Sequence, residues 1–194
     1  PERAADACAH AETLLGEVDD AELAAYPEAP LMLANAQLSS GRFAGCVASA
    51  ERGLAVSRAF RQDRLLVPLH IFAAMGRWNL AEPDAALEHL DAAEEGARLA
   101  QVPQLLSWTL WMRVQTQRIR GDQADIARVL PEARELTDSL PPSVPNSSGR
   151  CNLVAFDPRA SPERRLAGIV EAGGGPDLPR VDPVWGTALM RDLS

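Results

Sequence analysis

The sequence contains Gly41-Arg42-Phe43, Ala81-Glu82-Pro83, Gly121-Asp122-Gln123 and Ser161-Pro162-Glu163, turn-like triplets that begin at residues 41, 81, 121 and 161. The interval between successive triplets is therefore 40 residues, with no insertion. A fixed interval of this length is typical of repeat architectures, in which each repeat is one supersecondary unit. The triplets therefore indicate a series of related units along the chain.

Small and apolar side chains keep the same interval after each turn. Three sets of positions do so: Cys46, Ala86, Ile126 and Leu166; Ala50, Leu90, Leu130 and Val170; and Gly53, Ala93, Ala133 and Gly173. Spacings of four and then three residues place the members of each unit on one helix face. Before the turns, mostly small residues recur at Ala34, Ala74, Val114 and Val154, where two helices would approach closely. Each unit is therefore predicted to be a helix A, a tight turn and a helix B.

The periodicity predicts helices along almost the whole chain. They are expected at 2–17, 29–40, 43–60, 62–79, 83–101, 103–120, 122–139, 146–157, 161–172 and 182–193. Pro83 and Pro103 lie where a first-turn proline is tolerated, and Asp122 and Ser161 are predicted N-caps. Residues 140–149 are predicted to form a long loop, and residues 173–176 a second break.

One helix pair cannot bury its apolar face, so such units stack side by side into a superhelix. The pattern resembles the tetratricopeptide repeat (TPR), although the period exceeds the ~34 residues of that family. We expect an all-α fold, a TPR-like right-handed superhelix of about four helix hairpins with a 40-residue period. The prediction is one repeat domain over 1–194, with partial units at both ends and repeats at approximately 22–61, 62–101, 102–140 and 141–180.

Composition limits the function. All 19 basic residues are arginine, so a phosphate-loop lysine and lysine-based catalysis are absent. The net charge of −8 repels phosphate backbones, so no direct nucleic-acid partner is expected. Three cysteines without a CxxC pair fit a reducing cytoplasm. No uncharged stretch approaches the ~20 residues that span a bilayer, so no membrane partner is expected. The acidic N-terminus predicts no signal peptide, and the missing Met together with an end at Ser194 inside a predicted helix suggests an excised fragment.

Other candidate chemistry is weak. His10, His70 and His89 fall on three different predicted helices without a metal-ligand motif, so no metal site is expected. The glycines at 173–175 follow no strand and precede no lysine, which favours a loop over a phosphate site. Acidic residues at 84, 88, 91 and 95 form one helix stripe, best interpreted as a solvated face. We therefore expect no enzyme activity and no cofactor in this chain.

An aromatic stripe is the candidate binding surface. Trp108 and Trp111 are three residues apart on one helix face, which Gln115 and Arg118 continue. Positions one and two repeats earlier belong to other A helices, which line the concave side of such stacks. The predicted groove comprises Asn35, Ile71, Met75, Trp78, Trp108, Trp111, Gln115 and Arg118. Aromatic and polar residues together suit a ligand or peptide. The open alternative is that the tryptophans fill the core between repeats.

Two segments carry a resemblance to a known family. The run from Glu171 to Arg180, Glu-Ala-Gly-Gly-Gly-Pro-Asp-Leu-Pro-Arg, is followed by Asp182-Pro183. Together with Ala9-His10-Ala11-Glu12-x-Leu14-Leu15, it resembles the TPR-like region of large ATP-binding LuxR-type regulators from actinobacteria.

This resemblance implies a ligand- or protein-binding segment, similar to the inducer-binding domain of MalT-like activators. It would couple signal binding to ATPase and DNA-binding domains outside this chain. The implied partners are a protein or a small-molecule inducer, and the rest of the parent regulator. The alternative is a free-standing TPR-like adaptor for a protein partner.

Overall fold

Every element of secondary structure in the described residues is helical. The computed structural model describes residues 2–155 and 160–181. The helices are α1 (Glu2–Glu17), α2 (Asp20–Leu23), α3 (Glu28–Ser39), α4 (Phe43–Ala59), the 3-10 helix η1 (Asp63–Leu65), α5 (Leu66–Asn79), α6 (Pro83–Leu99), α7 (Pro103–Arg120), α8 (Gln123–Ser139), α9 (Val144–Ala155) and α10 (Pro162–Gly173). Over these two ranges no strand forms, so the all-α prediction is confirmed there. The helix predicted at 182–193 lies outside them.

The chain divides into two compact units, residues 1–100 and residues 101–194. The first contains α1 to α6 and the second contains α7 to α10. The boundary between the units lies within one residue of the boundary between the predicted repeats 62–101 and 102–140. The single repeat domain over 1–194 stays a prediction. None of the helices in the described part of the chain is long and apolar enough to cross a membrane.

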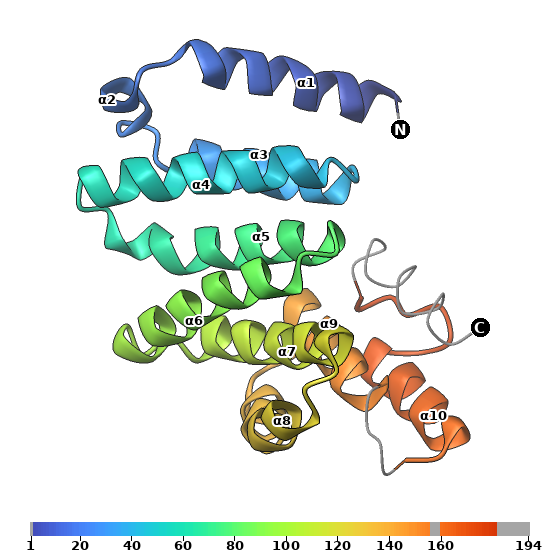
Figure 1. The fold of residues 1–194 in the computed structure, drawn as a ribbon. Helices are drawn as coiled ribbons and strands as arrows, with labels where there is room; N and C mark the ends of the chain where they lie inside the picture. The colour runs from blue at the N-terminus through green and yellow to red at the C-terminus, as the bar shows by residue number, and fades with distance from the viewer. Residues whose placement is uncertain (1, 156–159, 182–194) are drawn as a thin grey trace. The chain divides into compact units, whose positions relative to one another are not determined.

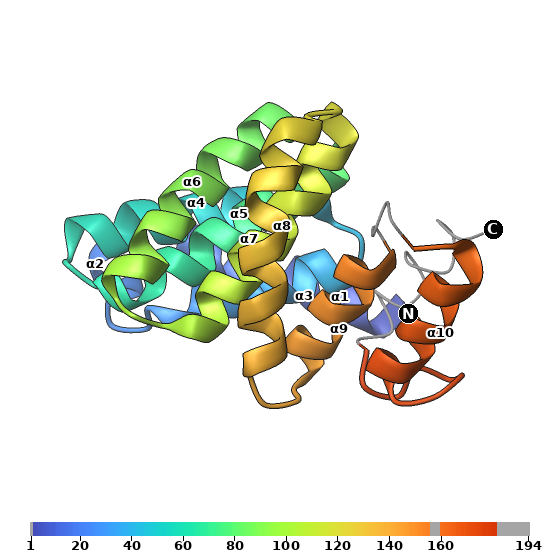
Figure 2. The same ribbon diagram turned by 90° about the horizontal axis from the view of Figure 1, so that it is seen from below.

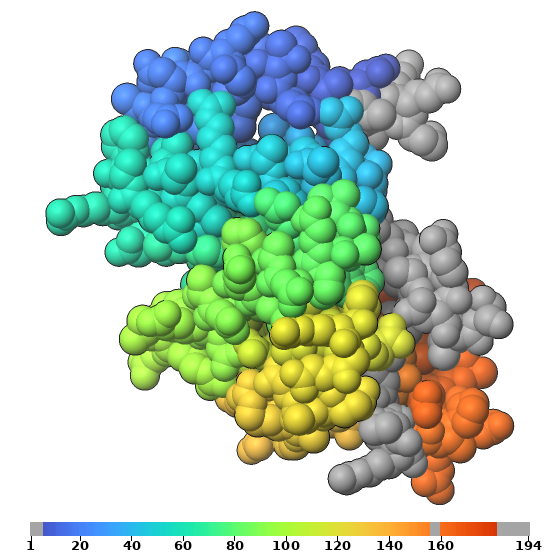
Figure 3. Space-filling view, viewed as in Figure 1, coloured from blue at the N-terminus to red at the C-terminus, as the bar shows by residue number. Residues whose placement is uncertain are grey.

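In the first unit, successive helices from α3 to α6 pack against one another, and α1 packs on α3 (Figure 1). The stripe residues Cys46, Ala50 and Leu90 have no exposed surface. Gly53 is required by close packing, since a Cβ there would lie 2.9 Å from Pro30 Cβ. In Figure 3, side chains of this unit, coloured blue to green, fill most of the space between the helices. The stripe therefore forms the packed side of α4 and α6, the B helices of this unit.

The helices α3 to α7 each end in a left-handed turn. Positive φ angles occur at Gly41 (75°), Arg61 (55°), Ala81 (60°), Gln101 (53°) and Gly121 (85°), which follow one another every 20 residues. After four of these residues, the next N–H donates to a carbonyl five residues earlier: Arg42 to Gln37 (2.8 Å), Gln62 to Ser57 (2.8 Å), Glu82 to Arg77 (3.0 Å) and Asp122 to Gln117 (3.0 Å). This Schellman closure satisfies carbonyls at the helix end.

In the second unit, α8 and α9 pack against α7 and against each other, and α10 packs on α9 (Figure 2). The interior combines apolar and polar side chains. Leu110 and Met112 of α7 have no exposed surface, while Ser107 and Thr137 share a buried hydrogen bond of 2.8 Å. The interior of this unit therefore depends partly on satisfied polar pairs.

The predicted loop over 140–149 is too long, because α9 already begins at Val144. Ser143 starts this helix: its Oγ accepts from the N–H of Asn146 at 3.3 Å. Pro145 lies in the first turn, where a missing N–H removes no helical hydrogen bond. Serines and glycine disfavour a helix locally, so burial of this face in the unit decides the conformation.

The predicted stripe holds only in part for α10: Gly173 is buried and Val170 is half-buried, but Leu166 is not buried. Leu166 is 50% exposed, whereas Ile169, three residues later, is 1% exposed. The first two turns of α10 therefore bury the neighbouring position Ile169 in place of Leu166, whereas its end keeps Gly173 of the stripe buried. Gly168 allows α10 to pack closely on α9, because a Cβ there would lie 2.6 Å from Cγ1 of Val154.

Candidate functional site

A cavity of about 440 Å³ lies within the second unit. Its charged lining comprises Arg134 and Asp138 of α8, Arg150 of α9, Glu171 of α10, and Arg180. Its remaining lining comprises Leu153, Val154, Gly168 and Ala172. The volume is in the range of small-molecule sites, which combine apolar walls with a few polar groups. In a chain of net charge −8, this lining has three guanidinium groups against two carboxylates.

Arg150 is fixed at the carboxyl end of α8. Its Nη2 donates to the carbonyls of Thr137 (3.0 Å), Asp138 (3.2 Å) and Leu140 (3.0 Å). A cation here satisfies terminal carbonyls and complements the helix dipole. Nε is buried and makes no hydrogen bond, although the Asp138 carboxylate lies 3.5 Å away. Since that carboxylate is 74% exposed, it compensates the Arg150 charge incompletely.

Arg134 and Arg150 link α8 and α9, because the side chain of each arginine donates to a backbone carbonyl of the other helix. Arg134 of α8 donates from Nη2 to the carbonyl of Leu153 at 3.2 Å, close to the end of α9. Arg150 of α9 reaches the end of α8. Each guanidinium is therefore held in place by backbone carbonyls of the other helix, and both line the same cavity.

A glycine turn brings Arg180 to the cavity. Gly174 ends α10 in the left-handed region with φ 84°, and Gly175 follows with φ 135°. The Arg180 N–H then donates to the Gly173 carbonyl at 3.0 Å, so the chain returns along the end of the helix. A Cβ at Gly174 would lie 2.9 Å from Cδ of Arg180, so a side chain there would displace the arginine. The glycine run thus positions a cation.

The first unit contains a second polar cluster, a histidine pair between α5 and α6. His70 Nδ1 and His89 Nδ1 are 3.0 Å apart, and Arg58 Nη2 lies 3.0 Å from His70 Nε2. The guanidinium can only donate, so His70 Nε2 accepts and His70 Nδ1–H donates to His89. His89 Nε2–H then faces the Glu51 carboxylate, 3.7 Å away. Both rings are therefore neutral in this arrangement.

The environment keeps these imidazoles neutral. Burial lowers the pKa of His70 to about 4, and the nearby charges of His89 and Arg58 act in the same direction. Burial also lowers the pKa of His89, although Glu51 opposes the shift. Two imidazoles do not make a metal centre on their own, and the described residues contain no cluster of three His, Cys, Asp or Glu that could hold a metal ion.

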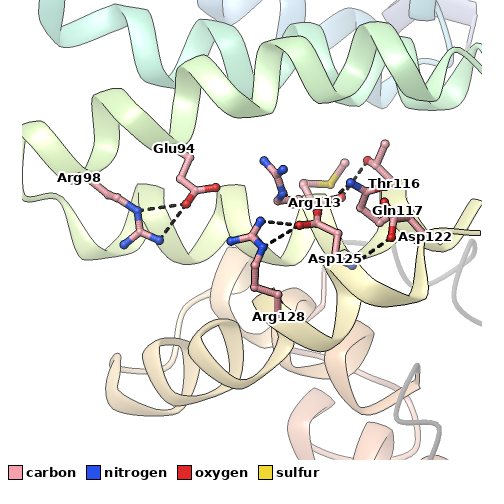
Figure 4. A network of polar contacts seen from close by, with 9 residues as sticks. Glu94, Arg98, Arg113, Thr116, Gln117, Asp122, Asp125 and Arg128 are labelled. Carbon is pink, nitrogen blue, oxygen red and sulfur yellow. Dashed lines mark hydrogen bonds and ion pairs between the residues drawn. The ribbon is translucent and has the colours of Figure 1, made fainter. Parts of the chain in front are cut away.

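Asp125 is the centre of a network at the start of α8 (Figure 4). Its Oδ2 accepts from Arg113 Nε at 2.9 Å and from Gln117 Nε2 at 2.8 Å, and its Oδ1 accepts from Arg128. Burial raises the pKa of this carboxyl, but the hydrogen bonds from Arg128, Arg113 and Gln117 outweigh burial and lower it overall. The network links α7 to α8 and carries no evident reactive group.

Two buried cysteines are poor nucleophiles. Burial raises the pKa of Cys46 to about 12 and that of Cys151 to about 11. Thiol reactivity depends on the thiolate, which is scarce at neutral pH with such values. Both thiols instead lie against backbone carbonyls, Cys46 at 3.4 Å from that of Phe72 and Cys151 at 3.5 Å from that of Ile169. They are part of the packing.

The predicted groove residues fall into two groups. Buried are Ile71 (0% exposed), Met75 (1%), Trp111 (2%) and Gln115 (3%), whereas Trp78 and Trp108 are partly exposed and Asn35 and Arg118 are exposed. Asn35, Ile71, Met75 and Trp78 belong to the first unit and the other four to the second. Trp111 lies against α9, where a Cβ on Gly149 would be 2.8 Å from its Cδ1. A groove through all eight stays a prediction.

The cavity arginines were not among the predicted site residues. Arg134 and Arg150 flank the proline-containing connection between α8 and α9, and Arg180 follows the glycine run. Arginines on both sides of a short connection between helices are a sequence signal that could have identified Arg134 and Arg150 as candidates. Nothing in the spacing indicates that Arg180 returns to the same place, because this depends on the backbone conformation at Gly174 and Gly175.

No model of a known protein family matches the chain, and comparisons with curated proteins and with solved structures find no significant match.

Proposed function

We propose that this chain is a TPR-like helical repeat segment that binds an effector and belongs to a LuxR-type transcriptional regulator. Its helix hairpins would form a right-handed superhelix with a 40-residue period, acting in the cytoplasm. Binding would be coupled to ATPase and DNA-binding domains outside this chain. The segment itself would bind a small-molecule inducer or a protein, without a cofactor and without catalysis.

The observation that carries this proposal is the cavity lined by Arg134, Arg150 and Arg180. It is concave, partly apolar and locally cationic, as an effector site requires. The segment that resembles LuxR-type regulators, residues 171–180, supplies three of its lining residues. The left-handed turns at 20-residue intervals support the repeat architecture, because they give successive helices similar lengths. Free, buried cysteines support a reducing compartment.

The experiment has two stages. Sequencing the reading frame beyond both ends should reveal a phosphate-loop motif upstream and a helix-turn-helix downstream. In that full-length protein, the Arg180→Gln substitution should alter the dependence of ATP hydrolysis or promoter binding on a cell-extract effector. Absence of both flanking domains would contradict the regulator and leave the adaptor as the better interpretation.

A gel shift addresses the chain itself. The 194-residue chain should not retard duplex DNA at physiological salt, because its charge of −8 opposes phosphate binding. A complex of micromolar affinity with unrelated DNA would contradict the proposal that DNA binding belongs to a domain outside this chain.

A further inference from the structure

We infer that the cavity of the second unit binds a small organic anion, a molecule with one carboxylate or phosphate group joined to an apolar portion. This inference names the effector class and rests on the proposed function only for its biological role. The site itself is argued from its residues.

Two of the three positive charges that line the cavity are held in place by backbone carbonyls. Arg134 and Arg150 are anchored to carbonyls of α9 and α8, so a ligand need not order these long side chains. Planar guanidinium groups match the geometry of carboxylate and phosphate oxygens. An anion between them would therefore gain charge-assisted hydrogen bonds at a reduced entropic cost.

A structural role accounts for only part of this charge. Capping of α8 uses Arg150 Nη2, while Arg150 Nε stays buried without a hydrogen bond. Arg180 is exposed and caps no helix through its side chain in the described contacts; the glycine turn nevertheless carries it to the cavity. A third cation beside two others costs repulsion unless an anion offsets it. The arrangement thus favours an anionic occupant.

The remaining lining defines the rest of the ligand. Leu153 and Val154 of α9 and Ala172 of α10 provide an apolar wall suited to an aliphatic or ring portion. Asp138 and Glu171 lie on the lining as well, and both are largely exposed. They reduce the net positive charge and disfavour ligands with several anionic groups. A single anionic head on an apolar body is the best match.

The test measures binding to the full 194-residue chain by calorimetry and two-dimensional NMR. The probes are hexanoate, hexyl phosphate, inorganic phosphate and the uncharged hexanamide. We expect saturable binding of hexanoate or hexyl phosphate with a dissociation constant at or below ~10 mM, as for small probes with modest ligand efficiency. Hexanamide should bind at least about tenfold more weakly, because it lacks charge-assisted hydrogen bonds.

Two variants locate the site. Arg180→Gln should weaken binding about tenfold or more, the loss expected for a hydrogen bond to a charged group. Because its side chain is exposed, this variant should fold normally. Ala172→Leu should block binding by filling the cavity while all three arginines remain. The matched control is Arg164→Gln, which removes the same charge from an exposed position of α10 outside the cavity.

The outcomes separate the possibilities. Binding of only one of the two hexyl anions supports the inference and identifies the head group. Equal binding of hexanamide, equal loss in Arg164→Gln, or no saturable binding by any anion overturns it. If the anion binds and the full-length regulator does not respond to it, this inference stands and the proposed function fails. A regulator that responds to an effector in the Ala172→Leu variant would place its effector site elsewhere and overturn this inference alone.

Discussion

Lowering the pH from 7 to 5 should destabilise the first unit through the buried pair His70 and His89. Since the pKa of His70 falls from 6.5 in the unfolded chain to about 4 in the folded one, the unfolded state binds more protons in this window. Stability is therefore complete above the unfolded pKa and is lost as pH falls toward the folded pKa. His89 acts in the same direction, because its pKa is also lowered.

The magnitude follows from proton linkage. For a pKa lowered from 6.5 to about 4, the free energy of unfolding should fall by about 2 kcal/mol between pH 7 and pH 5. This is a factor of about 30 in the unfolding equilibrium constant. The structural reason is that a protonated ring has no acceptor: charged His70 would direct an N–H at Arg58, which can only donate.

Urea unfolding of the chain at several pH values, followed by far-UV circular dichroism, measures this change. The double variant His70→Gln/His89→Gln keeps donors and acceptors at both positions but cannot take up a proton there, so its stability should be nearly independent of pH in this window. His10→Gln is the matched control, since His10 is exposed on α1 and lies outside the pair.

All three histidines lie in residues 1–100, so if the two units unfold in separate transitions, only that of the first unit should shift. An unchanged pH dependence in the double variant would refute the reasoning, because another group would then account for the proton uptake.

Four substitutions test the packing, the turns and the Asp125 network by urea unfolding. Trp111→Ala should cost ~3–5 kcal/mol, the usual loss for a buried tryptophan, and Trp108→Ala clearly less because Trp108 is partly exposed; equal losses would contradict the core assignment. Ala81→Gly should raise the free energy of unfolding by up to about 1 kcal/mol, because Ala81 has φ 60° and glycine adopts this conformation without strain. A lower free energy of unfolding would contradict this explanation of the turn. Asp125→Asn should cost ~1–3 kcal/mol, because it removes the charge that accepts hydrogen bonds from Arg113, Gln117 and Arg128; a neutral effect would show that the network contributes little.

Local signals made most helix ends predictable. Asp122 and Ser161 were expected as N-caps, and their side chains accept from Asp125 N–H at 3.0 Å and Arg164 N–H at 3.4 Å. Pro83 and Pro103 were expected in first turns; Pro83 begins α6 and Pro103 begins α7. Such signals act within four residues of the chain, so composition and spacing are sufficient to read them.

Other features depend on context that the sequence pattern does not contain. The turns at Arg61 and Gln101 have positive φ without glycine or asparagine, so their residue types give no warning of the backbone conformation. The early start of α9 at Val144 and the short helix α2 were likewise missed. In α9, packing in the second unit overrides weak helix propensity. A prediction based on propensity places its boundary too late.

The packing of α10 links the partial failure of the repeat pattern to the cavity. With the expected stripe buried, Leu166 would point into the unit, whereas it is 50% exposed. Instead α10 buries Ile169, and its small residues Gly168 and Ala172 line the space opposite α8 and α9. Small side chains leave volume unfilled, and the arginines of the other helices line that volume. Departures from a consistent pattern tend to coincide with functional sites, where packing is given up for another purpose. Here Ile169 lies between Gly168 and Ala172, which line the cationic cavity, so the departure and the cavity occur in the same part of α10, as the proposed binding role would require.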